Sequence, residues 1–110
     1  MFALHPILEL TSLLAQCYTG DVLRSRAAGA YLGVAVGDAF GATLEFLTPR
    51  EIQHRYGQHR EIIGGGWLGL RKGQVTDDTE MSLALGRSIL EAGKVDPEAV
   101  AEAFSVWMRA

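Results

Sequence analysis

The sequence predicts an all-α protein, and three observations support this prediction. Apolar residues recur every three or four positions in several segments, which is the spacing of one helix face. Two dipeptides, Thr48-Pro49 and Asp96-Pro97, combine an N-cap residue with a proline suited to the first helical position. We find no run of alternating polar and apolar residues of the kind that a half-buried strand requires.

Residues 1–22 are expected to form an N-terminal extension, and residues 23–110 to form part of a single domain. Helical spacing in the extension is carried by Leu4, Ile7, Leu8 and Leu14. Because Met1 to Tyr18 contains no lysine or arginine, the basic start of a signal peptide is absent.

The first long helix is predicted by an apolar stripe formed by Leu23, Ala27, Ala30 and Val34. Glycines at every fourth position, Gly29, Gly33 and Gly37, are costly within a helix. We expect them to allow close approach of another helix, and the alternative is a ligand at the Gly37 end. The apolar run 27–37 is too short to cross a bilayer, and Asp38 follows it. The sequence therefore predicts no membrane partner.

A short helix is expected to begin at Thr48, with Glu51 completing a capping box, and to end near Gly57. A glycine-rich loop, residues 63–73, comes after it. Glycine allows positive φ and close approach to the backbone, so the loop either shapes a ligand site or is a mobile surface segment.

The next helix is predicted to begin at the run Thr76-Asp77-Asp78-Thr79, before apolar residues at helical spacing: Met81, Leu85 and Ile89. One interpretation is a capping box between Asp77 and Glu80. The other is a cation site, because Mg²⁺ and Mn²⁺ prefer hard oxygen ligands. Capping requires one acceptor, which leaves the second aspartate and the two threonines unexplained.

A final helix is predicted after Asp96 and Pro97, with a core-facing stripe formed by Val100, Ala103, Phe104, Trp107 and Met108.

Upstream, Glu45 stands among apolar residues. A carboxylate is costly to bury unless it is paired or ligates a metal, so Glu45 is either a functional acid or faces water.

Composition sets further bounds. The net charge of −3 provides no basic surface for nucleic acid, and hydrophobic residues make up 48% of the 110 residues, as in a globular chain. Cys17 is the only cysteine, so a disulfide framework is excluded and we expect a reducing cytoplasm. The three histidines, His5, His54 and His59, are expected to be solvated.

Taken in order, these segments resemble the ADP-ribosylglycohydrolase family, most closely its branch that activates dinitrogenase reductase. The resemblance runs from Arg26 to Trp107 and is carried by residues 29–39, Thr-Pro-Arg-Glu-Ile, Gly-Gly-Gly-Trp-Leu and Gly-Gln-Val-Thr-Asp-Asp-Thr-Glu-Met-Ser-Leu-Ala-Leu-Gly-Arg. It implies an all-α domain that binds two Mg²⁺ or Mn²⁺ ions. The implied reaction hydrolyses the N-glycosidic bond to arginine and so removes ADP-ribose from an ADP-ribosylated protein. Dinitrogenase reductase is one candidate for that protein.

The resemblance also implies roles for individual residues. Thr76, Asp77 and Asp78 match the first group of metal ligands of the family. Glu45 matches an acidic residue that is proposed to act on the attacking water, and Asp38 matches a residue that we interpret as structural support.

One part of the family pattern has no match. The second ligand group of the family, an Asp-x-Asp-Thr-type motif, lies far toward the C-terminus of the family domain. After Glu80 the only aspartate in this chain is Asp96, so the motif has no match. We therefore expect an N-terminal fragment of the hydrolase that is inactive alone. The alternative is a non-catalytic remnant, or a metal-binding helical fragment without turnover.

Overall fold

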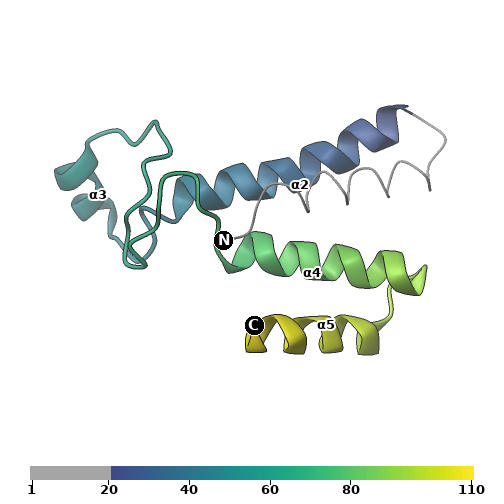
Figure 1. The fold of residues 1–110 in the computed structure, drawn as a ribbon. Helices are drawn as coiled ribbons and strands as arrows, with labels where there is room; N and C mark the ends of the chain where they lie inside the picture. Colours follow the sequence, from purple (N-terminus) through teal and green to yellow (C-terminus); the bar gives the residue numbers. More distant parts are fainter. Residues whose placement is uncertain (1–20) are drawn as a thin grey trace.

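The computed structural model describes residues 21–110, and this part of the chain is helical, as the sequence predicts. Its elements are α2 (Asp21–Gly41), α3 (Pro49–Tyr56), α4 (Asp77–Ala92) and α5 (Pro97–Arg109). Helix α4 packs against α2 on one side and α5 on the other. Figure 1 shows these three helices in antiparallel succession, with α3 and the glycine-rich loop at the end where α2 finishes and α4 begins.

The buried face of α2 is lined by small residues. Ala35 and Ala39 in its C-terminal half, with Ala42 directly after its end, are the buried hydrophobic side chains among the described residues. The helix predicted from the stripe is present, but the stripe is not the buried face, because Leu23 and Val34 are exposed. Helix α2 is apolar around much of its circumference, so periodicity alone does not identify the face that packs.

The glycines of α2 do not mark a helix contact within the described part of the chain. A Cβ on Gly29, Gly33 or Gly37 would meet nothing within 4 Å. The expectation that they admit another helix is therefore wrong for residues 21–110. The contact of α2 with α4 includes the hydrogen bonds of Asp38 to Thr76 and Thr79.

Helix α3 begins as predicted. The side chain of Glu51 accepts a hydrogen bond from the Thr48 backbone N–H at 2.8 Å, and the Glu51 N–H donates to the Thr48 hydroxyl at 3.3 Å. These two bonds form the capping box. The helix ends at Tyr56, and Gly57 follows with φ +64°.

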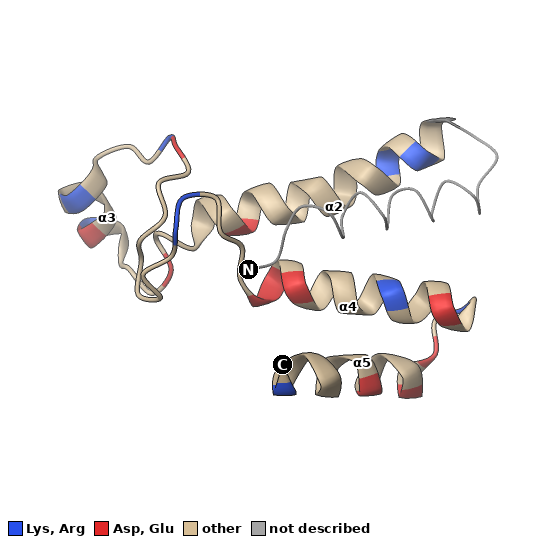
Figure 2. Cartoon of the chain, viewed as in Figure 1, with Lys and Arg blue, Asp and Glu red and all other residues tan. Residues whose placement is uncertain are grey.

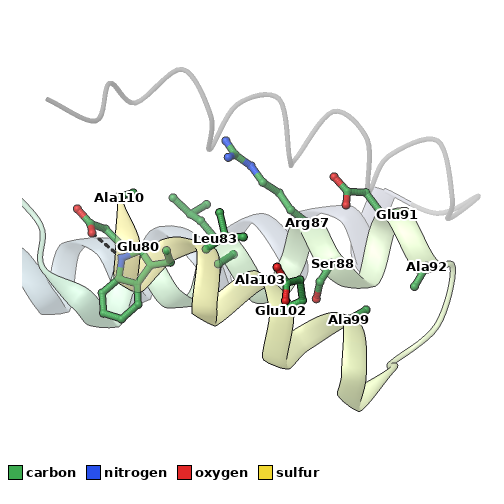
Figure 3. A pocket seen from close by; sticks show the side chains of 13 residues that line it. Glu80, Leu83, Arg87, Ser88, Glu91, Ala92, Ala99, Glu102, Ala103 and Ala110 are labelled. Atoms are coloured by element: carbon green, nitrogen blue, oxygen red, sulfur yellow. Dashed lines mark hydrogen bonds between the residues drawn. The ribbon is translucent and has the colours of Figure 1, made fainter.

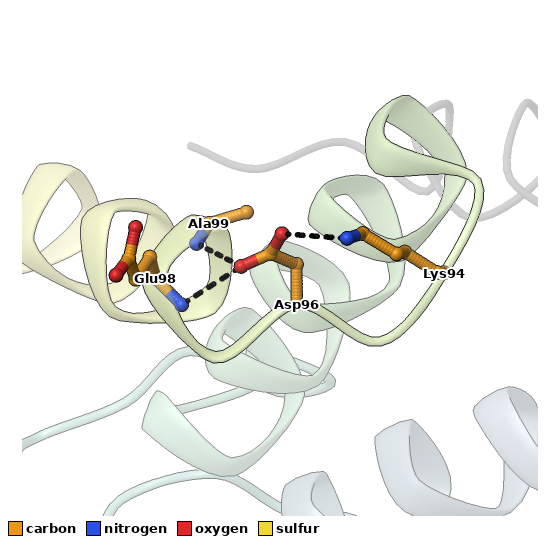
Figure 4. A network of polar contacts seen from close by, with 4 residues as sticks. All are labelled: Lys94, Asp96, Glu98 and Ala99. Atoms are coloured by element: carbon orange, nitrogen blue, oxygen red, sulfur yellow. Dashed lines mark hydrogen bonds and ion pairs between the residues drawn. The ribbon is translucent and has the colours of Figure 1, made fainter.

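Helix α5 also begins as predicted, at Asp96. Figure 4 shows the Asp96 carboxylate accepting from the backbone N–H groups of Glu98 (3.0 Å) and Ala99 (3.4 Å) while its second oxygen lies 3.5 Å from Lys94 Nζ. Both interactions form within four residues, which explains why the sequence reveals them.

A groove of about 650 Å³ runs between α4 and α5 (Figure 3). At one end the Trp107 indole N–H donates to the Glu80 carboxylate at 2.8 Å. Met108 was expected to face the core, but it is 78% exposed. The predicted stripe is therefore right for the half-buried Trp107 and wrong for Met108.

Three further predictions concern the N-terminal extension, membrane crossing and the histidines. The helical extension lies outside the described residues, apart from positions 21–22 at the start of α2, and His5 and Cys17 lie outside them as well. Between residues 21 and 110 we find no helix with the length and hydropathy that a bilayer crossing needs. His54 is exposed as expected, but His59 is half-buried, with its ring 2.9 Å from the Phe40 carbonyl oxygen.

Candidate functional site

The start of α4 is held by a carboxylate from a different helix. Asp38, near the end of α2, accepts hydrogen bonds from the backbone N–H groups of Thr76 (2.8 Å) and Thr79 (3.2 Å). It also accepts from the hydroxyls of both threonines, each at 2.5 Å. One side chain therefore satisfies two N–H groups that a helix N-terminus leaves without partners.

This arrangement replaces the capping box predicted between Asp77 and Glu80, which is wrong. Thr76 is the N-cap residue, it makes no capping bond through its own side chain, and Asp77 is already inside the helix. The Glu80 carboxylate bonds to Trp107 instead of the N-cap backbone. The two threonines that capping left unexplained are the hydroxyl donors to Asp38.

The environment of Asp38 favours its charged form. Burial raises the pKa of this carboxyl, but the hydrogen bonds from the hydroxyls and backbone of Thr76 and Thr79 oppose that effect and hold the pKa below its ordinary value. Because the Thr76 hydroxyl donates its hydrogen to Asp38, its oxygen lone pairs remain available to a cation. The interpretation of Asp38 as structural support agrees with this geometry.

The glycine-rich loop is anchored beside this helix start. Thr43, only 1% exposed, donates its hydroxyl to the Gly64 carbonyl at 2.9 Å. Gly64 and Gly66 both have positive φ, and a Cβ on Gly66 would stand 2.5 Å from the Ala42 carbonyl oxygen. Paired bonds between Gly65 and Leu70 close the loop. Glycine is thus required for backbone-to-backbone contact.

The anchored loop carries Trp67 to Glu45. The Trp67 indole N–H donates to Glu45 Oε2 at 2.9 Å, across 22 residues of sequence. Phe46 adopts φ +62°, a left-handed conformation that a non-glycine residue enters at a cost, and its ring lies edge-on to Trp67 with centroids 5.4 Å apart. Glu45 is exposed, and its orientation is set by the hydrogen bond from Trp67 and not by burial.

Three of the four predicted site residues line one cavity of about 560 Å³. They are Glu45, Thr76 and Asp77; the rest of the lining comprises Phe46, Trp67, Leu68, Leu70, Gln74, Val75 and Glu80. Asp78 does not line it, since successive helical residues point about 100° apart. The lining contains three carboxylates and no lysine or arginine, and Figure 2 shows acidic residues at the start of α4.

The donor set fits part of a divalent-cation site. The Asp77 and Asp78 carboxylates make no hydrogen bond to any described side chain or backbone group, and Thr76 offers a hydroxyl oxygen, so all three are hard oxygen donors free to ligate. Within residues 21–110, however, no three His, Cys, Asp or Glu side chains are grouped closely enough to hold an ion. The chain therefore contributes an incomplete set of ligands.

Two residues that line the cavity, Phe46 and Glu80, were not predicted from the sequence as part of the site. Phe46 carries no sequence signal, because a left-handed phenylalanine is decided by its surroundings. Glu80 was interpreted as a capping residue, although it lines the cavity and bonds to Trp107. The pairing of an acid in α4 with an indole in α5 depends on a contact between helices that periodicity does not specify.

Comparison with known proteins gives a consistent result. Residues 19–110 match the ADP-ribosylglycohydrolase family. The chain is 56% identical over 91 residues to an ADP-ribosyl-[dinitrogen reductase] glycohydrolase of Rhodospirillum rubrum, a match that covers 83% of this chain and 31% of that protein. It is 45% identical over 91 residues to an ADP-ribosylarginine hydrolase of Pseudomonas putida, covering 83% and 23%. The chain thus spans a third or less of the length of these relatives.

Proposed function

The chain belongs to the ADP-ribosylglycohydrolase family, and on that basis we propose that it supplies the N-terminal part of a metal-dependent ADP-ribosylarginine hydrolase. The reaction is hydrolysis of the N-glycosidic bond between ribose and the guanidine of a modified arginine. Two relatives that are named for hydrolysing ADP-ribosylarginine or ADP-ribosylated dinitrogen reductase support this substrate class.

The observation that carries the proposal is the attachment of Thr76 to Asp38 beside the cavity that Glu45 also lines. Four hydrogen bonds to one carboxylate fix the first turn of α4, and with it the direction of the Asp77 side chain. A set of rigidly placed, unpaired oxygen donors is what a hard cation requires, whereas a helix cap requires a single acceptor.

We assign Thr76, Asp77 and Asp78 as ligands of two Mg²⁺ or Mn²⁺ ions, together with residues that the rest of the hydrolase provides. Bound metal supplies Lewis acidity that orients ribose hydroxyls and stabilises developing charge. Glu45, held by Trp67, accepts the proton of the water that attacks the anomeric carbon. The bond between the anomeric carbon and the guanidine nitrogen breaks through a transition state with oxocarbenium character, and water forms the new bond to that carbon. The guanidine leaves as a neutral base and takes up the proton, so the products are ADP-ribose and the arginine guanidinium.

The test is release of ADP-ribose from ADP-ribosyl-arginine by the complete protein that carries this chain. Activity is expected with Mn²⁺ or Mg²⁺ and should disappear in excess EDTA. It should return when the metal is restored, which separates chelation from denaturation. Undiminished turnover in EDTA would refute metal dependence.

A second candidate is that the 110-residue chain by itself is a non-catalytic fragment. The incomplete ligand set within residues 21–110 favours it, as does the exposed Met108. Buried hydrophobic side chains in the described part are limited to three alanines, which provide a small core. The purified 110-residue chain should show no hydrolysis; robust turnover would mean that the described residues already contain a sufficient site.

We further propose an ADP-ribosylated protein as the partner, with dinitrogenase reductase as the first candidate, and a cytoplasmic location. The names of the two relatives support this substrate class, and the net charge of −3 provides no basic surface for nucleic acid. Incubation with ADP-ribosylated dinitrogenase reductase and with an unrelated protein modified on arginine would separate a narrow substrate preference from a general one.

A further inference from the structure

We propose that Phe46 and Trp67 form an aromatic subsite for the guanidinium of the modified arginine. This inference rests on the proposed function, and it names the residues that would distinguish arginine from other ADP-ribose acceptors. The two rings lie side by side at the cavity that contains Thr76 and Asp77. Within the described residues, neither ring is buried: each contacts the other, and Trp67 also bonds to Glu45.

The exposure of the two rings is the first argument. Phe46 is 76% exposed and Trp67 is 63% exposed, although large aromatic side chains contribute most to stability when they are buried. Their centroids are 5.4 Å apart and their planes meet at 74°, so a face of one ring stands at the edge of the other. We call the π surface that the Phe46 and Trp67 rings form together the aromatic corner.

The backbone conformation at Phe46 is the second argument. With φ +62° this residue occupies a region that L-residues other than glycine seldom adopt. The neighbouring loop is fixed by Gly66 against Ala42, which places Trp67 where the Phe46 ring meets it. A strained backbone that presents an exposed ring is typical of a ligand site.

Charge is the third argument, and it selects the ligand. The cavity lining includes the carboxylates of Glu45, Asp77 and Glu80 and lacks any basic side chain. One oxygen of Glu45 accepts the Trp67 indole N–H, which holds the carboxylate at the edge of the aromatic corner. Aromatic faces beside carboxylates attract a planar cation, through cation–π and charge interactions. Because Asp77 is assigned to the metal ions, the carboxylates that attract the guanidinium are those of Glu45 and Glu80, and a neutral adenine ring gains nothing from their charge.

The position of the subsite relative to the proposed metal ligands fits the substrate. In ADP-ribosyl-arginine the guanidine is bonded directly to the ribose carbon that is attacked. A subsite for the guanidinium must therefore share a cavity with the residues that hold the ribose. Thr76 and Asp77 line the same cavity of about 560 Å³ as Phe46 and Trp67.

The experiment uses the complete protein that carries this chain, with agmatine as the guanidinium probe and ADP-ribose as the second ligand. Calorimetric titration should show agmatine affinity reduced about 3- to 30-fold in Phe46→Leu and in Trp67→Leu, the range expected for loss of a cation–π contact. ADP-ribose affinity should change less than about 2-fold. Trp67→Phe, which keeps a ring but loses the N–H donor, should retain most of the agmatine affinity.

Trp107→Leu is the matched control. Trp107 also donates its indole N–H to a carboxylate, that of Glu80, but it lies on the α4–α5 groove and does not line the cavity. This variant should bind agmatine like the wild type. Equal loss in Trp107→Leu and Trp67→Leu would show a general effect of removing an indole, and it would overturn the inference.

A measurement on the wild type keeps the test independent of how the variants fold. In a ¹H–¹⁵N spectrum the Trp67 indole resonance should move on addition of agmatine while the Trp107 indole stays in place. Absence of a shift at Trp67 would overturn the inference. So would a loss of ADP-ribose affinity without loss of agmatine affinity in Phe46→Leu, since that result indicates an adenine platform.

Failure of this inference is distinguishable from failure of the proposed function. Wild-type hydrolysis of ADP-ribosyl-arginine with agmatine affinity that is insensitive to Phe46 and Trp67 would refute the subsite alone. Agmatine binding at the aromatic pair without any hydrolysis would support the subsite and refute the enzymatic proposal.

Discussion

Replacing Asp38 by asparagine should reveal how much of the fold depends on one carboxylate. Asp38→Asn preserves the size of the side chain but removes its charge. Asp38 Oδ2 accepts from the Thr76 N–H, the Thr79 N–H and the Thr79 hydroxyl, and Oδ1 accepts from the Thr76 hydroxyl. The best orientation of the amide keeps its oxygen at the Oδ2 position, so three bonds survive as neutral ones.

The size of the effect follows from these bonds. A hydrogen bond to a charged group contributes about 1.5–3 kcal/mol and a neutral one about 0.5–1.5 kcal/mol, so each surviving bond loses about 1 kcal/mol. Loss of a negative charge at the start of α4 costs a further ~0.3–1 kcal/mol. Because Asp38 is only half-buried, we expect a total of about 2–3 kcal/mol.

Urea unfolding of the complete protein, followed by circular dichroism, measures this loss as a lower midpoint with an unchanged slope. Asp96→Asn is the matched control: it is also an aspartate at a helix start, but a single oxygen makes both of its capping bonds. Asparagine caps as well as aspartate, so this control should lose only the charge at the helix start and the exposed Lys94 pair, about 1 kcal/mol or less. Equal free energies of unfolding for the two variants would refute the role given to the Asp38 charge.

Three further predictions concern the cavity and α3. Asp77→Asn and Asp78→Asn should each change the free energy of unfolding by less than about 1 kcal/mol, since neither side chain caps the helix. Their Mn²⁺ affinity, measured by calorimetry, should collapse. Wild-type Mn²⁺ affinity in both variants would exclude the two residues as ligands. Glu45→Gln should lower single-turnover hydrolysis at saturating metal by roughly 10²–10⁴-fold, and a wild-type rate would exclude it as the base. The Thr48 backbone and hydroxyl lower the pKa of Glu51, so the cap is fully formed above the ordinary value near 4.5 and is lost as pH falls through the lower folded pKa. The protection factor of the Thr48 N–H, its exchange rate relative to an unstructured amide at the same pH, should fall there, but not in Glu51→Gln, which caps without titrating.

The sequence by itself determined the helix boundaries, because the interactions that set them are local. The capping box of α3 joins residues three apart, and the Asp96 cap of α5 joins residues two and three apart. The start of α4 at the Thr-Asp-Asp-Thr run was also predicted correctly. The residues matched to the family likewise placed Glu45, Thr76 and Asp77 in one site, and the structure places all three at one cavity.

Only the tertiary structure decided which groups meet across the chain. Asp38 bonds to residues 38 and 41 positions away, Trp67 reaches Glu45 across 22, and Trp107 reaches Glu80 across 27. Such pairs depend on the packing of α2, α4 and α5. Helical periodicity does not identify the packed face of α2, because this helix is apolar on most of its surface. For the same reason the sequence suggested a capping box for Glu80 and a core position for Met108. A local pattern specifies which partners are within reach along one helix, whereas tertiary packing supplies competing partners that bind more strongly.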